Sequence, residues 1–470
     1  MTFSRLWTFL AVALPTLAGL LASMSTVDLA YHLRAGGELL DSGAIATHDT
    51  YTHTAAGAAW LNQQWAAQAI LAAVYRVAGW EGLVILRAAA IGATFGLVLL
   101  ACRLRGATPR TAALLTIAAF ALSAAALGLR PQLFGMLAFG VLLVIVAARR
   151  THPRLLWAAP ILALAWANLH GSFFIAPLCL GVAWLEGRHD RDPRARQTLA
   201  VAVVSALAAC ITPFGPGVWL YAAGLSTNPE VTSRISEWQP TTLRTTLGIA
   251  FYLSAVAVVA LLARRARSTP WPTLLWLGAL FAIGAYALRG VAWWPLGAVV
   301  VVAGLLDRPA QMRVERPVRL NVAVAALLVA AGVALLPWWR VPDPLAGRAG
   351  VLLEAPSSLT ATLRDLVRPG DRLFQPQAWG SWFELTVPAL PTFVDSRIEL
   401  FDPAVWREYA AVTEAIDGWP DILDRRGVTI VVTDDGTESV GDRLAKDPGW
   451  RRVYADTEGR IFVRADRPGG

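Results

Sequence analysis

Residues 7–34 have the sequence WTFLAVALPTLAGLLASMSTVDLAYHLR, an apolar run followed at once by a polar segment. A helix of about 20 apolar residues crosses the hydrocarbon core of a bilayer, and it must be a helix because lipid cannot satisfy exposed backbone groups. The run over 7–24 is long enough. This stretch therefore predicts a membrane span that leads directly into a polar loop carrying Asp28, His32 and Arg34.

The rest of the chain keeps this apolar character. Of its 470 residues, 56% are hydrophobic and only 16% are charged, a composition typical of membrane proteins. The basic residues do not cluster on one soluble face, so no nucleic-acid partner is expected. Cys102, Cys179 and Cys210 lie in or beside apolar runs, where they cannot form a disulfide framework.

Ten further apolar runs predict additional spans. Together with the first they indicate an all-α polytopic membrane bundle of about 11 spans, which occupies residues 1–339. The further runs lie near 82–102, 111–128, 132–148, 155–169, 172–186, 198–213, 246–263, 272–288, 290–306 and 320–338.

Arginines mark alternate loops between these spans, and short cytoplasmic loops are the ones enriched in basic residues. The pattern predicts a multi-pass protein of the inner (plasma) membrane, with its N-terminus in the cytoplasm and its C-terminal domain outside. The arginine-rich loops carry Arg103, Arg105 and Arg110; Arg149, Arg150 and Arg154; Arg188, Arg191, Arg194 and Arg196; Arg264, Arg265 and Arg267; and Arg308, Arg313, Arg316 and Arg319.

The segment 61–79 is amphipathic rather than uniformly apolar. If it crossed the membrane, every later arginine-rich loop would move to the outer face, so we expect it to lie in the outer interface, with tryptophans at headgroup depth. The first outer loop then runs over 25–81 and is the longest connection in the bundle.

Beyond Trp339 the composition changes, and residues 345–470 predict a soluble extracytoplasmic α/β domain. Asp395, Arg397 and Glu399 are expected to form a surface or interface constellation in it. The expected elements are strands at 371–375, 391–395 and 428–432, with Ile430, Val431 and Val432 in a central buried strand; helices at 378–385, 404–424 and 439–446; and a hairpin that joins 453–455 to 460–464.

The first outer loop holds the densest set of ionisable residues outside the soluble domain. Asp28 and His32 are four residues apart, so a helix would place both on one face. A carboxylate there could act as a general base that His32 orients, or the pair could help to hold a divalent cation. The alternative is that both are interfacial polar residues that end a span and form local hydrogen bonds.

His48, Asp49 and His53 repeat this residue chemistry further along the same loop. Threonines surround them, which favours a hydrogen-bonded turn over a metal site. We therefore expect no bound metal and no organic cofactor, a divalent cation being the one open alternative.

Arginines outside the arginine-rich loops are scarce. Arg130, Arg234, Arg244 and Arg289 lie on predicted outer turns, where a guanidinium could bind a phosphate in a forked pair or simply anchor to lipid phosphates. Arg87 lies inside the second span, where an unpaired arginine costs about 3 kcal/mol or more. We expect it to face the interior of the bundle near Asp28.

Two further polar groups interrupt the outer turns. His170 follows Asn168 in a tight turn that must either line a cavity or be buried in protein. Glu237 stands beside Trp238, whose ring could stack on a sugar or act as an interfacial anchor.

The chain resembles the GT-C superfamily of membrane glycosyltransferases, and most closely a bacterial group of largely uncharacterised GT-C-like proteins. Shared features are a first span that leads into an acidic residue on a long outer loop, about a dozen spans and an outer C-terminal domain. The residues that carry the resemblance are 28–37 (DLAYHLRAGG), 130–134 (RPQLF), 168–172 (NLHGS), 237–240 (EWQP) and 394–400 (VDSRIEL).

The resemblance implies transfer of a sugar from a polyprenyl-phosphate donor to an acceptor at the outer leaflet, as part of cell-envelope synthesis. Asp28 and His32 would be the catalytic residues. The partners would be the lipid-linked sugar donor and the bilayer. The alternative is a non-catalytic polytopic protein, either a transporter or a lipid-handling scaffold. The substrate-binding residues would be Arg34, Arg87, Arg130, His170, Glu237 and Arg289.

Overall fold

The structure, a computed structural model, describes residues 1–265, 269–306, 315–340, 342–343, 347–348, 350–434 and 438–467. Arg267, Arg308 and Arg313 of the arginine-rich loops, and the 345–346 start of the expected soluble domain, lie outside these ranges. The chain divides into two units: unit 1 comprises Met1–Ala22 and Leu83–Trp339, and unit 2 comprises Ser23–Gly82 and Arg340–Gly470.

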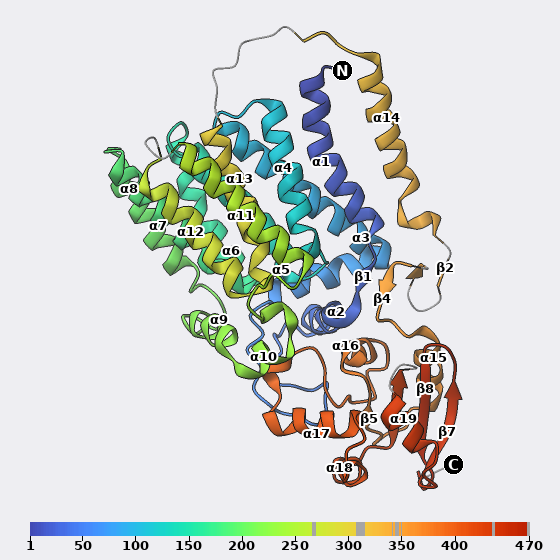
Figure 1. The fold of residues 1–470 in the computed structure, drawn as a ribbon. Helices are drawn as coiled ribbons and strands as arrows, with labels where there is room; N and C mark the ends of the chain where they lie inside the picture. Colours follow the sequence, from blue (N-terminus) through green and yellow to red (C-terminus); the bar gives the residue numbers. More distant parts are fainter. Residues whose placement is uncertain are drawn as a thin grey trace. The chain divides into compact units, whose positions relative to one another are not determined.

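Unit 1 is a helical bundle (Figure 1). Its α-helices are α1 (Phe3–Leu21), the greater part of α3 (Trp65–Leu104), α4 (Pro109–Ser123), α5 (Pro131–Ala148), α6 (Ala158–Leu169), α7 (Ile175–His189), α8 (Ala195–Ala208), α9 (Gly217–Thr227), α10 (Pro229–Arg234), α11 (Thr246–Arg264), α12 (Trp271–Tyr286), α13 (Trp293–Leu305) and α14 (Arg319–Ala334). Short 3-10 helices between them are η1 (Ala124–Ala126), η2 (Pro153–Trp157), η3 (Gly171–Phe174), η4 (Ser236–Trp238), η6 (Leu288–Ala292) and η7 (Pro337–Trp339).

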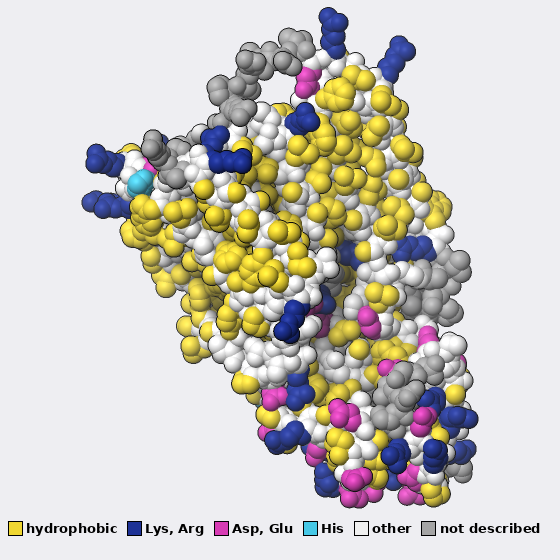
Figure 2. All heavy atoms as spheres, in the orientation of Figure 1, with side chains coloured by type: hydrophobic (Ala, Val, Ile, Leu, Met, Phe, Trp, Pro, Cys, Tyr) yellow, Lys and Arg dark blue, Asp and Glu magenta, His cyan; other side chains and the backbone are white. Residues whose placement is uncertain are grey.

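The core of unit 1 lies around α5 and α13. Both helices are apolar on all sides and largely buried, as expected of helices at the centre of a bundle. Phe139 of α5 packs against Trp293 of α13 with ring centroids 5.7 Å apart, and Trp166 of α6 lies 6.2 Å from Trp293. Peripheral helices such as α11 and α14 instead expose leucine and valine, and Figure 2 shows hydrophobic side chains over this face of the unit. These exposed apolar side chains suit contact with lipid.

Helices occur at all eleven segments expected to span the membrane, but they differ in length. Six helices within the described residues are long and apolar enough to cross a bilayer. Shorter apolar helices cover Ala195–Ala208, Trp271–Tyr286 and Arg319–Ala334. The helical membrane bundle is therefore confirmed, while the count of about 11 spans and the orientation of the termini stay predictions.

A backbone break separates the amphipathic segment from the span that follows it. Gly79 has φ 60° and ψ −156° in the middle of α3, a conformation that favours glycine. The division between 61–79 and 82–102 is therefore confirmed, and the boundary of the two units falls just beyond it, after Gly82. The location of 65–78 in the membrane interface stays a prediction.

Unit 2 contains a four-stranded sheet with the order β5-β6-β8-β7. Strand β5 (Leu373–Phe374) is parallel to β6 (Ile430–Asp434), and β8 (Gly459–Arg464) is antiparallel to both β6 and β7 (Trp450–Ala455). Ile430, Val431 and Val432 are fully buried in β6, as predicted, and the predicted hairpin is β7–β8. The helices of the unit are α2 (Thr26–Ser42), the start of α3, α15 (Ser357–Leu366), α16 (Gln377–Thr386), α17 (Pro403–Thr413), α18 (Trp419–Arg426) and α19 (Glu438–Leu444), with the 3-10 helix η8 (Ile398–Leu400).

Two expected elements of the C-terminal region differ. Residues 391–395 form no strand of the sheet. Pro391 O accepts one bond from the Leu373 N–H of β5, but the Thr392 N–H donates to Tyr51 O and the Phe393 N–H to the Gln375 side chain, so the ladder does not continue. The single expected helix at 404–424 is two helices, α17 and α18. Gly418 between them has φ 87°, and Pro420 begins the second helix.

Residues 23–82 fold together with the C-terminal region rather than with the bundle. Strand β1 (Met24–Ser25) is parallel to β4 (Leu352–Leu353), and α2 packs against α16. The other short strands, β2 (Pro342–Asp343) and β3 (Gly347–Arg348), form an antiparallel pair. The structure therefore places the first outer loop in a different unit from the one we expected for it.

A buried ion cluster fixes that loop within unit 2. The Arg397 guanidinium donates to Asp49 Oδ1 at 2.7 Å and to the Asp395 carboxylate, and all three side chains are buried. It lies over the rings of Tyr51 and Trp60, at 4.8 and 4.6 Å from their centroids. Of the expected surface or interface constellation, the surface alternative is wrong for Asp395 and Arg397. Both are buried where the first outer loop meets the C-terminal region, and Asp49 of that loop binds Arg397.

Candidate active site

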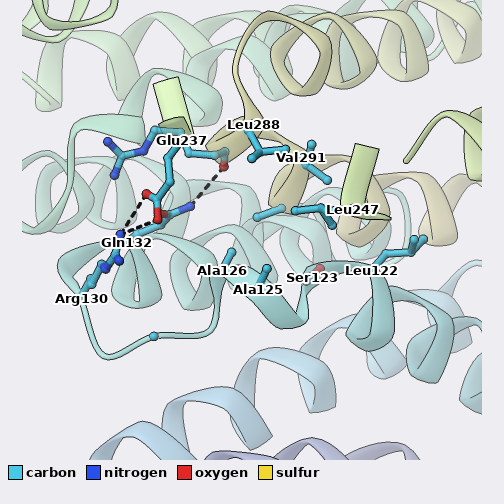
Figure 3. Close-up of a pocket in the computed structure, with 13 residues that line it drawn as sticks. Leu122, Ser123, Ala125, Ala126, Arg130, Gln132, Glu237, Leu247, Leu288 and Val291 are labelled. Atoms are coloured by element: carbon cyan, nitrogen blue, oxygen red, sulfur yellow. Dashed lines mark hydrogen bonds and ion pairs between the residues drawn. The ribbon is translucent and has the colours of Figure 1, made fainter. Parts of the chain in front are cut away.

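A hollow in unit 1 brings together three of the residues singled out from the sequence. We call it the Arg130 hollow; its volume is about 170 Å³. Arg130, Glu237 and Arg289 line it with Gln132, while Leu122, Leu247, Leu288 and Val291 are among its apolar walls (Figure 3). A polar end beside an aliphatic wall suits a ligand that is itself part polar and part hydrocarbon.

The arginine at position 130 is placed by the proline that follows it. Pro131 is the first residue of α5, and a proline disfavours the helical conformation at the residue before it. Arg130 is accordingly extended, with φ −134° and ψ 163°. Its Nη1 donates to both carboxylate oxygens of Glu237, each at 2.9 Å. The two side chains are 32% and 36% exposed, so this pair contributes at most about 1 kcal/mol and can open to an incoming anion.

The second arginine of the hollow, Arg289, packs against an aromatic ring. The Arg289 guanidinium lies 4.5 Å from the centroid of Trp238, a favourable cation–π distance. The Gln132 amide donates to Arg289 O at 3.3 Å, and the Leu288 N–H donates to Gln239 O at 2.9 Å. These bonds join η4 to η6 and to the start of α5. With two arginines and one glutamate, the residues that line the hollow carry a net positive charge.

His170 lies elsewhere in unit 1. It is buried at the end of α6, and its Nδ1 is 2.7 Å from Ser172 Oγ, which also accepts the indole N–H of Trp166 at 3.0 Å. Gly135 of α5 leaves the room for this group: a Cβ there would lie 2.9 Å from Ser172 Oγ. Of the two alternatives for His170, burial in protein is the one observed, and the residue does not line the Arg130 hollow.

Arg87 is buried in the protein, as predicted, while its expected position near Asp28 stays a prediction. It is 1% exposed, and its Nε donates to Gly19 O at 3.0 Å while its Nη2 donates to Ala22 O. These are carbonyls at the C-terminal end of α1, where a cation is favoured by the helix dipole. The side chain is therefore shielded from lipid.

Asp28, His32 and Arg34 all lie on α2 of unit 2. Asp28 is half-buried in the first turn of the helix, which begins after the cap Ser25. His32 is buried against Tyr31, and the Gln68 amide lies 3.3 Å from its Nδ1. The predicted helical spacing of Asp28 and His32 is thus confirmed; their chemical roles are not tested by this geometry.

Arg34 is held by protein groups. Its Nε donates to Glu38 at 3.0 Å, its Nη1 donates to Glu384 O at 2.9 Å, and its guanidinium lies 4.0 Å from the Tyr51 ring centroid. The Tyr51 hydroxyl in turn donates to Glu38 at 2.7 Å. Burial, with the Glu38 carboxylate next, holds the pKa of Tyr51 above its usual range. Arg34 thus links α2 to α16.

The residues considered for a metal do not converge. Asp49 binds Arg397 and accepts from the Thr52 N–H and hydroxyl, while His53 Nε2 lies 3.1 Å from Leu373 O. Throughout the described ranges, no three or more His, Cys, Asp or Glu side chains are arranged to hold a metal ion. The expected absence of a metal stays a prediction, and we derive no step through a cation.

Sequence reasoning missed the roles of two residues: Gln132, which lines the hollow, and Trp238, which packs against Arg289. Gln132 and Trp238 belong to the motifs 130–134 and 237–240, but no role was predicted for Gln132, and Trp238 was considered only for sugar stacking or anchoring. A signal was present for Trp238, since a tryptophan next to an isolated outer glutamate can also carry an arginine on its face.

Comparison with solved structures defines the fold. Neither a protein-family model nor a curated protein sequence matches the chain. The archaeal oligosaccharyltransferase AglB from Archaeoglobus fulgidus, in complex with an inhibitory peptide and a dolichol-phosphate, matches with a TM-score of 0.62 and 13% identity over 99% of this chain and 75% of that chain. The arabinofuranosyltransferase AftD from Mycobacteria matches with a TM-score of 0.59 and 18% identity over 99% of this chain and 40% of that chain.

The chain therefore has the fold of the GT-C membrane glycosyltransferases, as the sequence resemblance predicted. It spans well under half the length of AftD. At these identities the likeness defines the architecture, and activity must be argued from the residues.

Proposed function

We propose that the protein is a glycosyltransferase that moves a sugar from a polyprenyl-phosphate donor to an acceptor at the outer leaflet of the inner membrane. The observation that carries the proposal is the Arg130 hollow, where two guanidinium groups stand beside an aliphatic wall. A lipid phosphate combines the same two chemistries. AglB, which shares the fold, was solved with a dolichol-phosphate, so the architecture accommodates such a lipid.

In this proposal Arg130 and Arg289 bind the donor phosphate. Arg289, held over Trp238, is pre-organised, whereas Arg130 exchanges the Glu237 carboxylate for the phosphate. Glu237 is thereby released to accept a hydrogen bond from a sugar hydroxyl. Neutralising the charge that develops on the phosphate makes the lipid a good leaving group.

Asp28 is the general base of the proposed reaction. It removes the proton of an acceptor hydroxyl as that oxygen bonds to the anomeric carbon, and the bond from this carbon to the phosphate oxygen breaks with inversion. The electron pair leaves with the lipid phosphate. His32, the second catalytic residue of the proposal, orients the Asp28 carboxylate from the next turn of α2. The proposal assigns no substrate contact to Arg34, Arg87 and His170, which bond to protein groups.

The test separates binding from chemistry. The purified full-length protein in nanodiscs is titrated with a polyprenyl phosphate, and transfer from polyprenyl-phosphate sugars is then measured. Arg289→Gln should weaken lipid-phosphate binding by about tenfold, the loss of one hydrogen bond between charged groups. Arg234→Gln, which alters an outer arginine paired with Glu230, is the matched control and should bind normally.

Asp28→Asn keeps the shape of the side chain and removes its basicity. It should abolish transfer and leave lipid-phosphate binding intact. Unchanged transfer in Asp28→Asn would remove the catalytic role. Normal binding in Arg289→Gln would remove the donor site and favour a transporter or scaffold instead.

A further inference from the structure

A second hollow lies at the other end of α5. The helix begins at the Arg130 hollow and ends at Arg149, so its 18 residues separate the two by roughly 27 Å. We call this one the Arg149 hollow. Its polar lining is Arg105, Arg149, Glu186, Thr273 and Trp276, and its apolar walls include Leu143, Val146, Pro272, Val300 and Val301.

Arg149 does not behave as an ordinary basic residue at the end of a span. Such side chains usually extend outward to the headgroups, whereas Arg149 is only 4% exposed. Its Nη1 donates to Val146 O at 2.8 Å. Its Nη2 is ion-paired with the Glu186 carboxylate at 2.9 Å, but the N–H groups of Nη2 are not aligned with an acceptor.

A second donor in the same hollow also lacks an acceptor. The Trp276 side chain is 91% buried, being 9% exposed, and its indole N–H bonds to no protein group. A buried donor without a partner costs about 1–3 kcal/mol. Two such donors at one hollow indicate that an acceptor from outside the chain completes the site.

The charge around the hollow identifies that acceptor as an anion. Arg149, Arg150 and Arg105 all lie within 4 Å of the Glu186 carboxylate, at 2.9, 3.5 and 3.8 Å. Among the residues that line the hollow, Arg105 and Arg149 are cationic and Glu186 is anionic, which leaves one positive charge in excess. Gly304 of α13 lets Arg105 come close, because a Cβ there would lie 3.3 Å from its Nε.

We propose that the Arg149 hollow binds the phosphate of an anionic membrane lipid, with its acyl chains along the apolar wall. The phosphate oxygens accept from Arg149 Nη2 and from the Trp276 indole, and they neutralise the excess charge. Arg150 O also accepts from Arg194, so several of the arginine-rich loops meet here. The site therefore faces the leaflet that borders those loops, apart from the proposed donor site at the other end of α5.

The experiment uses the full chain in nanodiscs of phosphatidylcholine with or without phosphatidylglycerol. Bound lipid is counted by native mass spectrometry, and thermal unfolding is followed by tryptophan fluorescence. We expect phosphatidylglycerol to be retained preferentially and to raise the Tm. Trp276→Phe keeps the ring but removes the donor, and it should weaken retention by about tenfold.

Two further variants serve as controls. Trp271→Phe removes an indole from the exposed start of the same helix, and Arg154→Gln removes an exposed arginine of the same loop; both should retain phosphatidylglycerol normally. Equal retention of the two lipids, or normal retention by Trp276→Phe, would overturn the proposal. Equal stabilisation by inorganic phosphate in detergent would also overturn it, because the ligand would then be a soluble anion.

Discussion

Replacing Arg397 with methionine should lower the local stability of the loop that carries Asp49. Methionine keeps much of the hydrocarbon volume between Tyr51 and Trp60, but it leaves the buried carboxylates of Asp49 and Asp395 without their shared cation. Breaking a buried ion pair from one side costs about 3–5 kcal/mol, and loss of the cation–π contacts adds to this. We take about 4 kcal/mol as the expected loss of local stability.

Hydrogen exchange measures that loss where it occurs. In the full-length protein, amides of residues 47–60 should exchange up to roughly a thousandfold faster, since each 1.4 kcal/mol is a factor of ten in the opening equilibrium. The matched control is Arg425→Met, whose arginine is 60% exposed and paired with Glu408; it should change exchange very little. Similar exchange in the two variants would refute the role assigned to the cluster.

Other substitutions test the interior of each unit. Burial, with the Asp395 charge next, raises the pKa of Glu384 above its ordinary 4.5, so unit 2 should lose stability as the pH rises from there; Glu384→Gln should remove this slope in pH-dependent unfolding. Burial lowers the pKa of His53 from 6.5 to about 4. The stability that the neutral imidazole gives to unit 2 is therefore complete above pH 6.5 and falls by about 3 kcal/mol towards pH 4. His53→Gln should abolish this loss of stability at acidic pH in the same unfolding assay. Gly135→Ala should lower the Tm of the bundle through a cost of about 1–3 kcal/mol, because its methyl group would meet the bond between His170 and Ser172.

The fold was predictable to the extent that it depends on hydropathy. Apolar runs located the helices, because a span must satisfy its backbone alone, and the β-branched run at Ile430–Val432 located the central strand. The break in the expected helix at 404–424 could also have been predicted from the sequence. Gly418 and Pro420 stand together in the sequence, and an amphipathic pattern that continued across them concealed the turn.

The candidate site was predictable only as a set of residues. The scarcity of arginine on the predicted outer turns singled out Arg130 and Arg289. The motif around Glu237 followed from the resemblance. Their convergence depends on tertiary contacts between distant positions, such as Arg130 with Glu237, 107 residues apart, and Gln132 with Arg289, 157 residues apart. Burial of Asp395 and Arg397 was not predictable from composition, because charged residues are seldom fully buried without a partner that sequence cannot identify.

Unit 2 is made of two segments of the chain, Ser23–Gly82 and Arg340–Gly470, that are synthesised at different times. Asp49 leaves the ribosome 348 residues before Arg397, its partner in the cluster. At roughly 5–20 residues per second, the early segment must wait from about 20 seconds to more than a minute for the chain that completes it. During that interval the helices of unit 1 from α4 to α14 are synthesised. A chain that ends before Arg397 would leave the Asp49 carboxylate without the guanidinium that binds it.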